Sequence, residues 1–137
     1  MTTDQDLAID EEEFHSSFRV FLHAVEMLAA APEEQCRMMG NFNVAWELKE
    51  DVKAGKFLAG QGYLTPLEEA WVQSLVAALD PINTQVLPSS TDAKANLEAM
   101  SHPAWQPVRY LAAEVLLQLS TSAASNATYL RLPKSAA

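Results

Sequence analysis

Three carboxylates at helical spacing are candidates for catalysis or metal binding. Glu47 precedes Glu50 and Asp51 by three and four positions, so a helix would bring all three to one flank. Paired carboxylates act as general acid and base or hold a hard cation, but each use needs further ligands or a raised pKa. Three lysines are interleaved with them: Lys49, Lys53 and Lys56. This mixture favours a solvated flank first, a patch that contacts a partner second, and catalysis last.

The histidines and the single cysteine form no metal or nucleophile pattern. His15 and His23 lie eight positions apart, whereas a metal pair prefers three or four with a further ligand, so we expect both at the surface or the edge of the core. His102 stands before Pro103 without an acid or serine partner, so a hydrogen bond to the loop backbone is its default and catalysis its minor alternative. Cys36 has no neighbour that would lower its pKa, which predicts a structural buried thiol.

Motifs of known enzyme classes are also missing from the sequence. It contains no Gly-rich phosphate loop, no GxSxG elbow, no metal-spaced Cys/His set and no basic–aromatic nucleic-acid surface. We therefore predict no catalytic residue, no metal site and no cofactor, and we expect that the protein is not an enzyme.

Helical periodicity predicts the elements that must position these residues. A first amphipathic helix should run from about residue 11 to 30, started by a capping box of Asp10 and Glu13. Its apolar stripe has alternating spacings of four and three: Phe14, Phe18, Phe21, Val25 and Leu28. A second helix should start at Pro32 and run to about residue 59, with an irregularity near Gly40.

The stretch Gly40–Leu64 has apolar residues on two opposite sides, which predicts a central helix with neighbours on both. One side holds Val44, Ala45, Leu48 and Val52, and the other holds Met39, Phe42, Trp46 and Phe57. On this interpretation Trp46 anchors the core, and Trp71 and Trp105 do the same from other elements. One exposed tryptophan would instead mark an interface anchor.

A third helix is predicted from Pro66 to about residue 79 because Thr65, Pro66 and Glu68 combine an N-cap, a first-turn proline and a capping-box acid. Four residues of this helix are expected to face inward: Leu67, Trp71, Leu75 and Ala78. An irregular loop near 80–105 with a short helix through Met100 precedes a last long helix at about 106–120. Residues 1–9 and 121–137 are expected to be loose or extended tails. The fold class is therefore all-α: one domain, residues 1–137, with four to five helices bundled around the central helix.

Acidic charge is concentrated at the start of the chain. Residues 1–34 hold nine acidic residues against Arg19 alone, which accounts for −8 of the net charge of −9. Such a charge disfavours binding to nucleic acid and anionic membranes, and it attracts basic partners toward the protein. The lone cysteine, the absence of a signal-peptide pattern and the lack of a long apolar segment predict a cytoplasmic protein.

Two stretches of the chain resemble a known class of small acidic proteins. The sequences NVAWELKEDVKAGKFLAGQGYLTPLEE and NLEAMSHPAWQPVRYLAAEVLLQL, within about residues 36–119, are similar to immunity proteins encoded beside bacterial polymorphic toxins. The resemblance implies a cytoplasmic inhibitor that binds one cognate toxin and blocks its active site or its dynamics. It carries no motif from which functional residues can be transferred.

The functional hypothesis joins this resemblance to the charge pattern. A toxin inhibitor needs no catalytic set and gains association rate from an acidic face opposite a basic target. We expect the partner-binding residues to be Glu11, Glu12, Glu13, Glu47, Glu50 and Asp51. The alternative is a regulatory or adaptor module that could form a homodimer through the aromatic face of the first helix. A small-ligand binder or enzyme using the loop at 86–107 is the third hypothesis.

Overall fold

The computed structural model describes residues 10–39, 43–82 and 93–130, and α-helices dominate these ranges. The elements in chain order are α2 (Glu11–Ala29), α3 (Pro32–Met39), α4 (Val44–Lys53), the 3₁₀ helix η1 (Ala54–Leu58), α5 (Pro66–Ala78), α6 (Ala93–Met100), α7 (Trp105–Gln118) and α8 (Ser120–Tyr129). No strand occurs in the described ranges. The predicted all-α single domain is confirmed, with more and shorter helices than the four to five expected.

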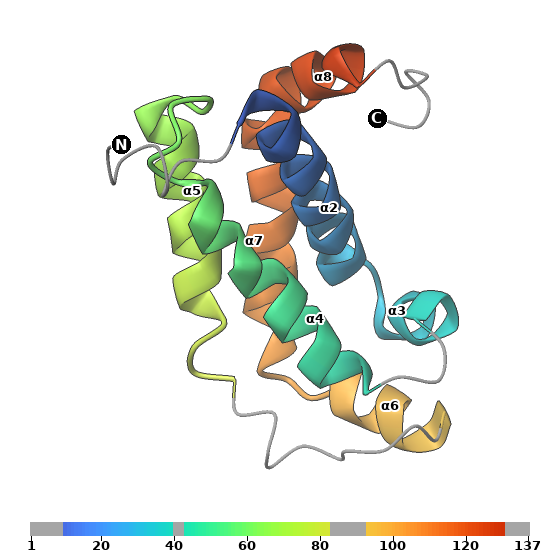
Figure 1. Cartoon of the computed structure of the whole chain (residues 1–137). Helices are drawn as coiled ribbons and strands as arrows, with labels where there is room; N and C mark the ends of the chain where they lie inside the picture. Colours follow the sequence, from blue (N-terminus) through green and yellow to red (C-terminus); the bar gives the residue numbers. More distant parts are fainter. Residues whose placement is uncertain (1–9, 40–42, 83–92, 131–137) are drawn as a thin grey trace, which may run out of the picture.

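Four long elements form the body of the bundle, and the shorter helices close its two ends. Helices α2, α4, α5 and α7 lie beside one another, with α3 and α6 at one end and α8 at the other (Figure 1). Helix α2 packs against α4, η1, α7 and α8, and α7 also packs against α5. The stretch Gly40–Leu64 contains α4 and η1, which together pack against α2, α3, α5 and α6, so it has several neighbouring elements as α2 does.

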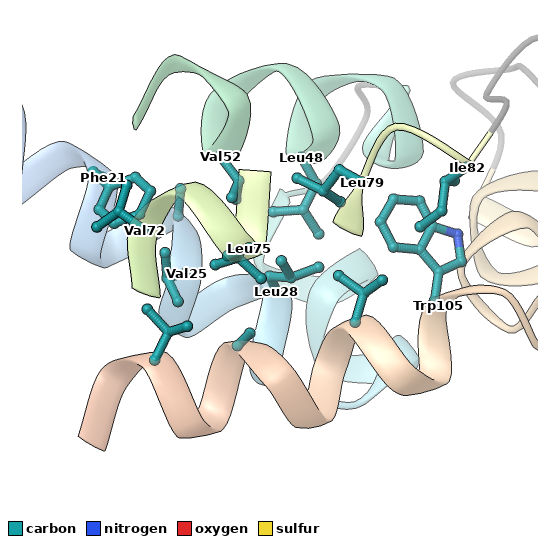
Figure 2. Close-up of a cluster of buried hydrophobic side chains, with 14 of the residues drawn as sticks. Phe21, Val25, Leu28, Leu48, Val52, Val72, Leu75, Leu79, Ile82 and Trp105 are labelled. Atoms are coloured by element: carbon teal, nitrogen blue, oxygen red, sulfur yellow. The ribbon is translucent and has the colours of Figure 1, made fainter. Parts of the chain in front are cut away.

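Apolar side chains from α2, α4, α5 and α7 meet in one core (Figure 2). The predicted stripe of α2 is confirmed, since all five of its residues are buried. Trp105 at the start of α7 is fully buried near Leu79 and Ile82. Burying a tryptophan of this size contributes several kcal/mol, about 3–5 on truncation to alanine.

Side-chain caps explain where α2 and α5 begin. The Asp10 carboxylate accepts from the Glu13 backbone N–H at 2.7 Å, which is the N-cap bond of the capping box predicted at the start of α2. Thr65 and Glu68 form the predicted reciprocal capping box at α5, with distances of 3.1 and 2.9 Å. Each cap satisfies N–H groups that the first helical turn leaves without a partner.

The single helix expected from residue 32 to 59 is wrong, because the structure divides it into three pieces. α3 ends at Met39, and α4 starts afresh after Asn43, whose side chain accepts from the Trp46 N–H at 3.2 Å. The predicted irregularity at Gly40 and the residue Phe42 lie outside the described residues. The helix then tightens into η1 at Ala54 and ends before Gly60 and Gly62, which have φ of 79° and 89°. Only glycine takes such positive φ values easily, so the predicted end of the helix is confirmed.

At Gly55 the backbone of η1 packs directly against Phe21 of α2. A Cβ added there would lie 2.3 Å from Cε1 of Phe21, whose side chain is itself buried. The glycine that weakens the helix therefore permits close packing of two elements, as glycine does where backbones approach.

The expectation that α4 is covered on both sides is also wrong. Val44, Ala45, Leu48 and Val52 are buried as predicted, but Trp46 and Phe57 on the opposite side are exposed. Of the three tryptophans predicted in the core, Trp105 is fully buried, Trp71 is half-buried against the core, and Trp46 is half-exposed. In α5, Leu67 is exposed and Val72 is buried in its place, whereas Leu75 faces inward as expected.

Residues 121–129 are not a loose tail. Ser120–Tyr129 forms α8, which packs on α2 and on the end of α7. Asn126 fastens it, because its buried amide donates to the His15 carbonyl at 3.0 Å and accepts from His15 Nδ1. Tyr129 stacks on the His15 ring with centroids 4.0 Å apart. Small polar residues here support a helix through tertiary contacts that local propensity does not reveal. The remaining predicted tails, 1–9 and 131–137, lie outside the described residues.

Candidate functional site

The outer face of α4 and η1 carries aromatic side chains that the core does not use. Trp46 is 49% exposed and Phe57 is 67% exposed. They lie eleven positions apart in the chain, and neither belongs to the core cluster. Large exposed aromatic side chains are enriched as anchors in protein–protein contacts. The exposed tryptophan that the sequence left as an alternative is therefore what the structure contains.

The three predicted carboxylates lie on α4, the helix that also carries Trp46. Glu50 and Asp51 are exposed, and Glu47, which follows Trp46 directly, is half-buried. The interleaved lysines are engaged elsewhere: Lys53 forms an ion pair with Asp80 at 3.1 Å, and Lys49 donates to the Ile82 carbonyl. Lysines thus tie α4 to the end of α5, in place of the i,i+3 pair of Glu50 with Lys53. The acidic flank keeps more of its negative charge available than the sequence pattern indicated.

Asp51 lies in a setting that disfavours its charge. Partial burial, followed by the nearby Glu50 carboxylate, raises the pKa of the Asp51 carboxyl above its ordinary value. A positive group beside Asp51 would reverse this effect, because an opposite charge favours the ionised form. The flank is therefore suited to a cation from a partner.

The acidic residues of α2 divide between two surfaces. Glu11, Glu12 and Glu13 are all exposed in the first turn. Glu11 lies 3.5 Å from His15 Nε2. Partial desolvation raises the pKa of the Tyr129 phenol, with further contributions from the Glu11, Glu12 and Asp10 charges, which places these acids beside the end of α8. Glu13 instead faces η1, so the six predicted partner-binding residues do not form one cluster.

Glu13 and Asp51 meet at a groove between α2 and η1. Helices α2 and α4 run in opposite directions, so the start of α2 lies beside the end of α4 (Figure 1). The groove has a volume of about 650 Å³. Its floor includes Phe21 and Gly55, and its apolar wall includes Val20 and Phe57. Of the six predicted residues, Glu13 and Asp51 are the pair that the fold brings to one described cavity.

Val20 is the residue of this groove that the sequence interpretation missed. It lies off the buried stripe of α2, on the face where Ser16, Ser17 and Arg19 are exposed. An apolar side chain among polar ones on the solvent face of an amphipathic helix was the available signal. The stripe was used to find the core, and the apolar residue outside it was left out.

The remaining candidates occupy structural positions. His102 is exposed, and its Nδ1 accepts from the Ala104 backbone N–H at 3.0 Å, which confirms the predicted bond to the loop backbone. His23 is exposed as predicted, and His15 lies at the edge of the core under α8. Cys36 is half-buried rather than fully buried, and burial raises the pKa of its thiol. The loop at 86–107 is described only from residue 93 onward.

Within the described residues, no group of three His, Cys, Asp or Glu side chains is placed to hold a metal ion. None of the helices in those ranges is long and apolar enough to cross a membrane. The chain matches no protein-family model, and no curated protein or solved structure is significantly similar to it. The site must therefore be interpreted from its own geometry.

The aromatic face of α2, proposed as a homodimer surface, is not available for that purpose. Phe14, Phe18 and Phe21 are 1–3% exposed, because they pack in the core. What α2 presents to solvent is its acidic first turn and a largely polar face that includes the exposed Val20.

Proposed function

We propose that this protein is a cytoplasmic immunity protein that binds a cognate bacterial toxin and neutralises it by a protein–protein contact. The observation that carries the proposal is the half-exposed Trp46 on the outer face of α4, beside Glu47, Glu50 and Asp51. This aromatic residue contributes its surface to solvent rather than to the core. An exposed aromatic anchor with acidic neighbours is the composition that suits binding to a basic protein surface.

The negative net charge of this protein supports a toxin with a basic surface. A net charge of −9 steers a positively charged partner toward the protein and repels nucleic acid and anionic lipid. If the toxin acts on nucleic acid or nucleotides, its substrate cleft is basic, and carboxylates from α4 would occupy it. Inhibition then requires no catalytic group, metal or cofactor from this chain.

Co-expression with the product of the adjacent gene tests the proposal directly. We expect the wild-type protein to restore growth of cells that express the toxin, and the two proteins to elute together on sizing chromatography. Trp46→Ala should abolish rescue while the fold is retained, as hot-spot aromatics cost about 2 kcal/mol or more in binding. Tyr110→Ala is the matched control, since Tyr110 is also an exposed aromatic side chain but lies on α7. Failure of wild-type rescue and of complex formation would reject the toxin-inhibitor function.

Charge-reversal variants distinguish the contribution of long-range attraction to the association rate from the contribution of the Trp46 contact. Glu47→Lys combined with Asp51→Lys should slow association and flatten its dependence on salt, because long-range attraction acts mainly on the association rate. Glu26→Lys on the exposed side of α2 should have a smaller effect. Association rates that do not change with the α4 variants would remove the acidic flank from the interface.

A further inference from the structure

Two exposed apolar side chains from separate elements meet in one groove of the protein. Val20 of α2 and Phe57 of η1 are each 67% exposed, and both line the cavity of about 650 Å³. Cavities of roughly 300–1,000 Å³ are large enough to take a bulky side chain or a small molecule. Exposed apolar residues that converge in a hollow indicate a contact site, whereas single scattered ones do not.

The groove depends on the absence of a side chain at Gly55. Any Cβ there would meet the Phe21 ring at 2.3–2.6 Å, so the backbone of η1 and the ring lie in direct contact. Phe21 is buried and cannot turn aside freely. The floor is therefore held by packing between α2 and η1, and the groove is a fixed feature of the fold.

Charge around the groove selects what can enter it. Glu13 stands on the α2 side and Asp51 on the α4 side. Lys56 is the basic residue of the lining, and its ammonium group lies 5.1 Å from the Phe57 ring centroid, where a cation–π contact holds it. The lining thus has two carboxylates against one engaged cation, with Glu12 and Glu50 next to them in the sequence.

We propose that this groove receives a bulky apolar side chain of a partner protein, with a neighbouring Lys or Arg of that partner held between Glu13 and Asp51. The apolar side chain of the partner covers Val20 and Phe57, and its cation neutralises the negative charge of Glu13 and Asp51 at the rim of the groove. The inference rests on the proposed function and deepens it, because it states the chemistry that the toxin offers. A partner segment with adjacent apolar and basic residues is the expected occupant.

A short synthetic amphipathic peptide of leucine and lysine serves as the probe, with its leucine–glutamate counterpart as the matched peptide. Each is titrated into the ¹⁵N-labelled full-length protein and followed by backbone amide shifts. We expect the lysine peptide to shift the amides of Asp51, Gly55 and Phe57, which line this groove and not the cavity between α2 and α8, and to bind at least about tenfold more tightly than the glutamate peptide. Equal affinities, or shifts concentrated in the cavity between α2 and α8 (Arg19, His23, Ala123), would overturn the proposal.

Surface variants then test the apolar part of the site. Val20→Lys and Phe57→Ala should each weaken the lysine peptide by about tenfold. Leu117→Lys and Tyr110→Ala on α7 are the controls, because these side chains are 65% and 69% exposed and lie outside the groove. Equal weakening by Leu117→Lys would show a general charge effect and would overturn the groove. Sedimentation velocity on the same variants tests whether a second copy of this chain occupies the groove instead. A dimer that Val20→Lys disrupts would show that it does, and would reject the proposal.

The two failures can be told apart with the toxin itself. If the toxin is neutralised and bound equally well by the Val20→Lys and Phe57→Ala variants, the groove inference fails while the proposed function stands. If the lysine peptide occupies the groove but no rescue of growth occurs, the groove inference stands and the toxin-inhibitor function fails.

Discussion

The Arg109 guanidinium donates to the side-chain oxygen of Gln35 at 3.3 Å, although the two residues are 74 positions apart. Arg109 also donates to the Met100 carbonyl at the end of α6. Gln35 in turn donates to the Met27 and Leu28 carbonyls at 3.1 and 3.0 Å. These carbonyls belong to the last turn of α2, where the i+4 donors of the helix are missing, and the Met27 carbonyl also accepts from the Ala30 N–H at 3.1 Å. Two buried polar side chains thereby join α2, α3, α6 and α7.

Arg109→Met should destabilise the protein by about 2–4 kcal/mol, since it leaves the Gln35 oxygen and the Met100 carbonyl buried without their donor. Urea unfolding followed by circular dichroism measures the change. Arg37→Met is the matched control, because Arg37 is exposed and pairs with Glu34 on the surface. It should cost less than about 1 kcal/mol. Equal midpoints for the two variants would show that the buried network contributes no stability.

Local patterns in the sequence predicted the parts of the fold that depend on local physics. The stripe of α2 and the caps at Asp10 and Thr65 were confirmed because helix period and N-terminal hydrogen bonds act over a few residues. α8 was missed because its support comes from His15, more than a hundred positions away. The polar network of Gln35 and Arg109 is non-local in the same way, so neither residue stood out in the sequence.

The candidate site shows the same division. The carboxylates of α4 were found by spacing, but only the structure shows that Glu13 and Asp51 share a groove. Trp46 was assigned to the core because an apolar residue on a helix has no mark that distinguishes core from interface. The break between α3 and α4 and the start of η1 changed which sides of the segment are covered. Burial is decided by the neighbours, and the sequence of one helix does not contain them.

Trp105 and Trp46 provide a direct test of this distinction. Trp105→Ala should destabilise the protein by about 3–5 kcal/mol because it removes a fully buried ring. Trp46→Ala should change the unfolding free energy by less than about 1 kcal/mol, as exposed positions usually do. Thermal unfolding of the two variants beside the wild type measures both. A loss at Trp46 as large as that at Trp105 would mean that Trp46 supports the fold, and its role as an interface anchor would lose its basis.

Gly55→Ala should destabilise the protein by about 1–3 kcal/mol, because the new methyl group overlaps the Phe21 ring. The loss should shrink when Phe21 is replaced by leucine, since the smaller side chain frees the space. A double-mutant cycle of Gly55→Ala and Phe21→Leu, read by urea unfolding, measures the coupling. Additive losses in the cycle would show that another contact makes glycine necessary at this position.

Asn126→Ala should release α8 while the rest of the bundle stays folded. The substitution removes the hydrogen bond to the His15 carbonyl and leaves that region of α2 without its partner, at a cost of about 1–3 kcal/mol. Hydrogen exchange should then accelerate across Ser120–Tyr129 and remain slow in α4 and α5. Ser125→Ala, at an exposed position of the same helix, is the control. Uniform acceleration in all helices would instead show that α8 and the bundle unfold together.

The titration of Asp51 should make partner binding depend on pH. Partial burial and the Glu50 charge raise the pKa of its carboxyl, so Glu50→Gln should lower that pKa, as ¹³C carboxyl shifts can measure. Glu26→Gln, on the solvent face of α2, should leave the pKa of Asp51 unchanged. A cation at the rim of the groove favours ionised Asp51. Binding of the leucine–lysine peptide to the wild-type protein must therefore lower the pKa of Asp51 from its raised value in the free protein. By linkage, affinity then rises as pH increases through the titration of Asp51, and Asp51→Asn removes this rise. An affinity that follows the same pH dependence in the asparagine variant would place the partner's cation elsewhere on the protein.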